Sequence, residues 1–154
     1  MRAIVVSVFV AFGPTLAAQG LLDFEGTWVG SCPDCAPGAM RGGVGKTLVI
    51  RVSGSEISIQ RDGFPAEVYR LDGTDTQLPD GRTATATVQQ ESLVLTTVRR
   101  RARSRDEVYQ TIMHSTYRVS ANTLTIDRST RAVRPDEPAS DKWVSLGTVV
   151  YQRN

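Results

Sequence analysis

Hydrophobic and polar residues alternate along most of the chain, in short runs separated by turns rich in Gly, Asp and Ser. Leu48, Ile50 and Val52 lie on one face of one predicted strand. Ile57 and Ile59 repeat the alternation in the next run. Asp-Gly pairs between runs favour tight turns, because glycine adopts positive φ and aspartate bonds its own backbone. The pattern predicts nine strands, at residues 24–30, 46–52, 56–61, 66–71, 83–88, 92–98, 107–119, 122–130 and 147–153.

Residues 107–119 also fit a helix, because Tyr109, Ile112 and Met113 would share a helical stripe. The segment is rich in β-branched residues, however, and their restricted χ1 angles favour a strand, which we predict. Residues 135–143 are expected to form a loop or a short helical turn before the last strand. Short strands at close spacing predict an all-β fold, either a sandwich or a barrel.

The first part of the chain has the pattern of a secretory signal peptide. A basic Arg2 precedes the apolar run Ala3–Phe12, and small residues end at Ala18, where cleavage is expected. The run is too short to cross a bilayer, which takes about 20 apolar residues, so no transmembrane segment is predicted. We expect residues 1–18 to be removed and residues 19–154 to form a single secreted or periplasmic domain.

Composition narrows the classes of function. The chain has 18 basic and 16 acidic side chains, whereas nucleic-acid binders usually show a strong basic excess, so we expect no nucleic-acid partner. Two Cys and one His leave few ligands for a metal. No Ser–His–Asp or Cys–His set has a recognisable spacing. We therefore predict no catalytic activity, no metal and no cofactor.

Several short motifs follow one another at characteristic spacing. They are Gly26-Thr27-Trp28, the hairpin of residues 47–59, YRLDG at 69–73, LVLTT at 93–97, YRVSANTLTIDR at 117–128 and VVYQR at 149–153. In this order they resemble a group of bacterial secreted lipocalin-like (calycin-type) domains. The resemblance spans nearly the whole chain after residue 18. It implies an all-β antiparallel meander that closes into a small lipocalin-like barrel of about 8–9 strands. It implies little about function, although small barrels of this kind can hold one ligand.

The first loop departs from that family pattern. Cys32 and Cys35 form a CxxC pair, and an oxidising compartment favours a disulfide between them. A redox role would require a helix N-terminus to lower the thiol pKa, and a zinc site would require four ligands. We predict a structural disulfide, with redox or metal binding, or two free thiols, as the alternatives. The glycine-rich residues 41–47 look like a phosphate-binding loop, but a strand rather than a helix follows them, so we interpret them as a connection.

A dense run of arginines is the second departure, at Arg99, Arg100, Arg101, Arg103 and Arg105. As a functional feature it would contact an anionic partner such as lipid head groups or polyanionic sugar. As a structural feature it is a solvated hairpin tip whose like charges discourage aggregation, and this reading is favoured.

Three residues of the predicted strand 107–119 form a candidate pocket wall. Tyr109, Met113 and Tyr117 share one face and would suit a flat apolar molecule, or would simply fill the core. His114 falls on the opposite face and is interpreted as an ordinary strand residue. An acid/base pair among Glu67, Glu107 and Asp127 is conceivable, but polar strand residues usually face solvent.

The sequence thus favours a non-catalytic secreted or periplasmic barrel that binds a small apolar or amphipathic ligand. The alternative is a cell-envelope protein that docks an anionic surface or a protein partner through residues 99–105. The oligomeric state is not indicated by the sequence.

Overall fold

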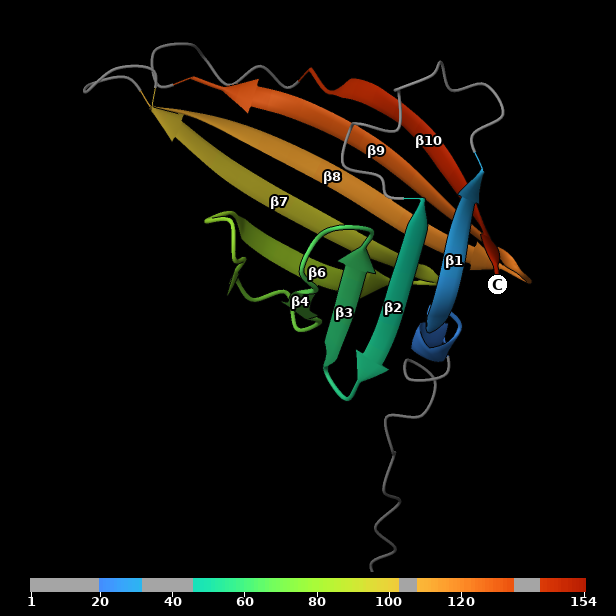
Figure 1. The fold of residues 1–154 in the computed structure, drawn as a ribbon. Coiled ribbons are helices and arrows are strands. Elements are labelled where there is room, and N and C mark those ends of the chain that lie inside the picture. The colour runs from blue at the N-terminus through green and yellow to red at the C-terminus, as the bar shows by residue number, and fades with distance from the viewer. Residues whose placement is uncertain (1–19, 32–45, 103–107, 135–141) are drawn as a thin grey trace, which may run out of the picture.

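The structure is a computed structural model that describes residues 20–31, 46–102, 108–134 and 142–154. These residues form one antiparallel sheet of ten strands, curled into a nearly closed barrel (Figure 1). A helical turn at residues 20–22 precedes the first strand. The strands are β1 (Gly26–Ser31), β2 (Thr47–Ser53), β3 (Glu56–Arg61), β4 (Glu67–Arg70), β5 (Thr76–Gln77), β6 (Thr83–Gln89), β7 (Ser92–Ala102), β8 (Val108–Ser120), β9 (Thr123–Val133) and β10 (Val144–Arg153).

The strands form two meanders, β1 to β4 and β5 to β10, which are joined into one sheet by the pairing of the first strand, β1, with the last, β10. The spatial order is β4-β3-β2-β1-β10-β9-β8-β7-β6-β5. Most neighbours are therefore also consecutive in sequence. The exception is the pair β1 and β10, in which Trp28 lies opposite Arg153, while Trp28 also lies opposite Leu48 of β2.

The barrel closes along a seam between the two edges of the sheet, where β4 approaches β5 and β6. At one end of the seam, a backbone bridge joins Asp72 to Thr87. There the amide of Gly73 donates to the carbonyl of Ala86 at 3.1 Å, with Gly73 at a positive φ of 77° that favours glycine. At the other end, β4 is joined across the seam by charged side chains, which are described with the cavity below.

A compact core fills one end of the barrel. Trp28 is fully buried and its indole Nε1 donates to the carbonyl of Phe24 at 2.9 Å. Leu21 and Phe24, in and just after the helical turn, are also buried and cover this end. The buried apolar cluster comprises Phe24, Trp28, Leu48, Ile50, Ile57, Ile59, Tyr69, Leu78, Ala84, Ala86, Leu93, Leu95, Tyr117, Leu124, Ile126 and Tyr151.

The other end of the barrel is open on one side. Figure 1 shows that β7, β8, β9 and β10 are long and extend past the shorter strands β1 to β4. A bulge in β10 between Ser145 and Gly147, where Gly147 has φ 88°, changes the alternation. As a result Leu146 lies on the same side of the sheet as Tyr151.

The predicted all-β barrel is confirmed, with ten strands instead of nine. The additional strand β5 has two residues, which is too short to produce an alternating pattern. The segment that also fitted a helix is a strand, β8. The helical turn that the structure shows lies before β1 and was not predicted. Residues 135–141, where a turn was expected, lie outside the described residues, and Lys142 and Trp143 are irregular.

Candidate ligand-binding cavity

A cavity of about 610 Å³ occupies the open end of the barrel. This volume lies within the range of small-molecule binding sites, about 300–1,000 Å³. Its wall is formed by seven strands, β2, β3, β4, β7, β8, β9 and β10, and by the loops that follow β3 and β5. The barrel therefore has a packed end and a hollow end.

The floor of the cavity is apolar and continuous with the core. Leu48, Tyr117, Ile126 and Tyr151 belong both to the buried cluster and to the cavity lining. Each of these side chains is at most 4% exposed. The floor is therefore a buried, largely apolar surface that an aliphatic or aromatic group could cover.

The long strands add a wall of hydroxyl groups around one methionine. Thr97 and Ser115 are buried polar residues that line the cavity, together with Thr111, Met113 and Thr130. Thr130 donates its hydroxyl to the carbonyl of Ile112 at 3.0 Å. The remaining hydroxyls are donors and acceptors at the cavity surface.

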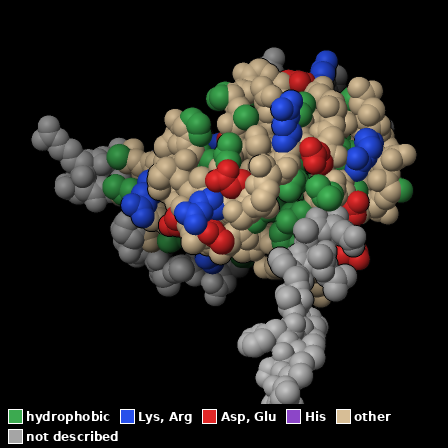
Figure 2. Space-filling model, turned by 90° about the horizontal axis from the view of Figure 1, so that it is seen from below, with side chains coloured by type: hydrophobic (Ala, Val, Ile, Leu, Met, Phe, Trp, Pro, Cys, Tyr) green, Lys and Arg blue, Asp and Glu red, His purple; other side chains and the backbone are tan. Residues whose placement is uncertain are grey.

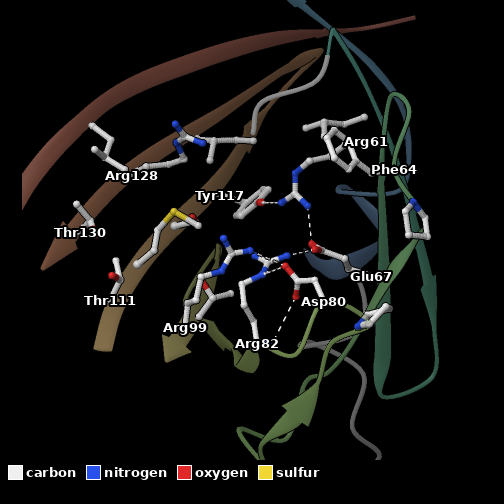
Figure 3. A pocket seen from close by; sticks show the side chains of 18 of the residues that line it. Arg61, Phe64, Glu67, Asp80, Arg82, Arg99, Thr111, Tyr117, Arg128 and Thr130 are labelled. Atoms are coloured by element: carbon white, nitrogen blue, oxygen red, sulfur yellow. Dashed lines mark hydrogen bonds and ion pairs between the residues drawn. The ribbon is translucent and has the colours of Figure 1, made fainter. Parts of the chain in front are cut away.

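Charged side chains line the mouth and connect into what we call the arginine ladder, formed by Arg61, Glu67, Arg82, Asp80 and Arg99. Arg61 Nη1 donates to Glu67 Oε2 at 2.5 Å, and Arg82 Nη2 donates to Glu67 Oε1. Arg82 Nε donates to Asp80 Oδ2 at 2.6 Å, and Arg99 Nη2 donates to the same oxygen at 2.8 Å. The ladder bridges the seam, because Glu67 is on β4 and Arg82 directly precedes β6 (Figure 3).

Two tyrosines fix the inner end of the ladder. The Tyr69 hydroxyl donates to Glu67 Oε2 at 2.5 Å, and Arg61 Nη2 donates to the Tyr117 hydroxyl at 3.3 Å. Figure 3 shows the side chains of Arg61, Arg82 and Tyr117 turned toward a common space. This space lies where the charged mouth meets the apolar floor.

The electrostatics of this region favour an anion. Burial alone would raise the pKa of Glu67, but the hydrogen bond from Tyr69 and the interactions with Arg61 and Arg82 hold it below its usual value. Glu67 is therefore ionised at neutral pH. On the opposite wall, burial lowers the pKa of Arg128. Interactions with Tyr117 and Tyr151 raise this pKa, whereas the positive charge of Arg61 lowers it further. Arg61 and Arg128 thus repel each other.

The lowered pKa of Glu67 makes stability depend on pH. Because the folded-state pKa lies below the unfolded value of about 4.3, the stabilisation is full above that pH. It is lost as the pH falls through the folded-state pKa. We expect the difference in unfolding free energy between wild type and Glu67→Gln, measured with urea, to be constant above a pH of about 6 and to shrink below about 4. A difference that is independent of pH would contradict this assignment.

The predicted pocket wall is partly in the cavity. Met113 and Tyr117 line it, and Tyr117 is also part of the core. Tyr109 is partly buried and lies farther along β8, opposite Arg101, but is not among the lining residues. His114 lies on the other face of β8, as expected, where its ring stacks on Trp143 at 4.3 Å.

The arginine run divides between two faces of β7. Arg99 and Arg101 line the cavity, whereas Arg100 does not and is exposed. Arg103 and Arg105 lie outside the described residues, so a role of the full run in anion contact stays a prediction. Cys32 and Cys35 also lie outside them, and their disulfide stays a prediction.

Among the acidic residues that were considered, Glu67 is the one in the cavity, and its partners are arginines. Asp127 faces outward and accepts hydrogen bonds from Arg118 and Thr148 at 2.5 Å each. Glu107 lies outside the described residues. In the described part of the chain, no cluster of three or more His, Cys, Asp or Glu side chains could hold a metal ion. The helix found in that part is neither long nor apolar enough to cross a membrane.

Most residues of the arginine ladder were not predicted from the sequence. Its signal is present in the alternation: Arg61 continues the inward series of Ile57 and Ile59, and Arg128 continues that of Leu124 and Ile126. A charged residue that extends an apolar strand face by one step points into the same barrel interior. Such residues mark the level at which a barrel stops being packed.

Comparisons with known proteins add a structural likeness. The chain matches no protein-family model and no curated protein. A solved structure similar to it is the crystal structure of apo Caenorhabditis elegans lipid binding protein 8. The two share 12% sequence identity and a TM-score of 0.49, with 86% of this chain and 96% of that chain covered. The barrel fold of this chain is established by its own strand order and register.

Proposed function

We propose that this protein is a non-catalytic binding protein that holds a small amphipathic anion in its barrel. The observation that carries the proposal is that the cavity described above combines a buried apolar floor with an arginine-rich mouth. An amphipathic molecule would place its apolar part on the floor and its anionic group among the guanidinium groups. The proposal places the mature protein outside the cytoplasm, because residues 1–18 have the pattern of a signal peptide.

The arginines support an anionic group. Five arginines and two carboxylates are among the described residues that line the cavity. A guanidinium carries five N–H donors in a fork that fits carboxylate and phosphate oxygens. An anion between Arg61 and Arg128 would also relieve their repulsion. Charge-assisted hydrogen bonds at this partly buried position are stronger than those between neutral groups.

The floor and the rim support an apolar part. Tyr117 and Ile126 offer buried apolar surface, and Met113 adds an adaptable side chain. At the mouth, Phe64 and Leu146 line the cavity although they are 61% and 45% exposed. Exposed apolar side chains at the rim of a cavity are typical of binding sites.

The test compares two fluorescent probes, a fatty acid with a free carboxylate and its uncharged methyl ester. We expect the carboxylate probe to bind more tightly than the ester, and its affinity to fall with added salt because ions screen the arginines. The ester's affinity should change little. Fluorescence titration at low and high salt measures both. The proposal would be rejected if neither probe binds, or if the two probes bind with equal affinity at every salt concentration.

The alternative, docking to an anionic envelope surface through residues 99–105, stays a prediction. Two of its described arginines, Arg99 and Arg101, line the cavity, which favours ligand binding for them. Figure 2 shows basic and acidic side chains interspersed on the face that it presents, without a broad basic area among the described residues.

A further inference from the structure

We propose that Glu67 is a built-in competitor of the ligand, an internal carboxylate that occupies the anion site until a ligand displaces it. This inference rests on the proposed function and deepens it, since it names what regulates the same site. It assigns Glu67 a role in ligand selection that goes beyond joining the barrel seam.

The contacts of Glu67 are those that a bound carboxylate would make. Oε2 accepts from Arg61 at 2.5 Å and from the Tyr69 hydroxyl at 2.5 Å, and Oε1 accepts from Arg82. The side chain is 12% exposed, so these contacts are made largely away from water. Arg61 and Arg82 cannot offer the same N–H groups to a ligand while Glu67 holds them.

The position of Glu67 in the fold allows displacement. It lies in β4, an edge strand that pairs with one neighbouring strand, β3. Around Glu67, the seam is joined by the side chain of Arg82, whereas the backbone bridge lies at the far end, at Asp72. Edge elements with few backbone hydrogen bonds open at low cost. The carboxylate can therefore move out of the site without the loss of backbone hydrogen bonds on both sides of its strand.

The consequence is a threshold for binding. Small, weakly held anions such as chloride or acetate would have to replace Glu67 without compensation. An amphipathic anion gains the additional free energy of its apolar part on the floor, and this gain offsets the displacement. The competitor therefore selects for molecules that carry both parts.

Asp80 provides a matched control within the same ladder. It is also a carboxylate that accepts from two arginines, Arg82 and Arg99, but its side chain is 40% exposed against 12% for Glu67. Solvent screens its charge more strongly. Removing the charge of Asp80 should therefore affect anion binding less than removing that of Glu67.

The decisive experiment measures the affinity of the carboxylate probe and its methyl ester for wild type, Glu67→Gln and Asp80→Asn. We expect Glu67→Gln to bind the carboxylate probe on the order of tenfold more tightly, because a negative charge close to the bound group is removed. The ester should be unaffected, and Asp80→Asn should change the carboxylate affinity by less than about threefold. Unchanged or weaker binding of the carboxylate probe by Glu67→Gln would overturn the inference, and leave the proposed function intact if wild type binds.

Two other outcomes of the binding experiment would also decide whether Glu67 acts as a competitor. Binding by Glu67→Gln but not by wild type would show that the probe does not displace Glu67, and would reject the proposed function and this inference. Absence of probe binding by both proteins would reject the proposed function and this inference together.

A second measurement needs no variant, in case Glu67→Gln does not fold. The ¹³C carboxyl signal of Glu67 in wild type should shift when the carboxylate probe is added, while that of the exposed Glu25 stays in place. The ester should not produce the shift. A Glu67 signal that stays in place at saturation with the carboxylate probe would overturn the inference.

Discussion

Replacing Trp28 with alanine is expected to lower the free energy of unfolding by about 3–5 kcal/mol, the range for truncation of a large buried aromatic side chain. Trp28 is fully buried, and its strand pairs with both β2 and β10. The substitution leaves a cavity at the packed end of the barrel and removes the hydrogen bond to Phe24. Urea unfolding followed by circular dichroism measures the change.

Trp143 is the matched control, because it is the second tryptophan and lies outside the barrel. It stacks on His114, and the guanidinium of Arg131 lies 5.0 Å from its ring centroid. Such partly exposed contacts contribute about 0.5–1.5 kcal/mol, so Trp143→Ala should destabilise far less than Trp28→Ala. Similar losses from both substitutions would contradict the assignment of the core to the Trp28 end.

Replacing Arg61 with methionine is expected to weaken the binding of the carboxylate probe by about 1.5–3 kcal/mol, which is roughly 10- to 150-fold in affinity. Methionine keeps an apolar stem of similar length but removes the guanidinium that lies between Glu67 and Tyr117. The methyl ester should bind Arg61→Met about as well as wild type, because it gains little from the charge. Fluorescence titration with both probes measures the two affinities.

Arg70→Met is the control for the loss of one arginine. Arg70 forms an exposed ion pair with Asp72 at 2.6 Å and is not among the cavity-lining residues. It should leave both affinities unchanged. Equal weakening of the two probes by Arg61→Met would indicate general damage to the barrel, and unchanged carboxylate binding would place the anion elsewhere.

The fold could be predicted because most of the strands carry their own signal. Leu48, Ile50, Leu93 and Leu124 alternate with polar residues, and all four are buried as the pattern requires. A strand packed on one face produces this alternation whatever its neighbours are. The helical turn before β1 was missed, because three residues are too few to show a helical period.

The candidate site was harder to predict, since alternation indicates which side chains point inward but not how wide the barrel is at each level. Tyr117 and Met113 were identified as a wall, and both line the cavity. The ion pair Glu67–Arg82 crosses the seam and joins β4 to the residue that precedes β6, and no local pattern connects these two positions. The side chains that meet at the mouth are brought together by closure of the sheet.

The pairing of β1 with β10 also has a consequence for how the chain folds. Hairpins such as β6–β7 and β8–β9 join neighbouring segments and can form early, at a small cost in loop entropy. Trp28, in contrast, pairs with Arg153, which lies far from it in the sequence, so this contact closes a long loop. We therefore expect β1 to pair with β10 only after the intervening hairpins have formed, and this late, long-range step to limit the rate of folding.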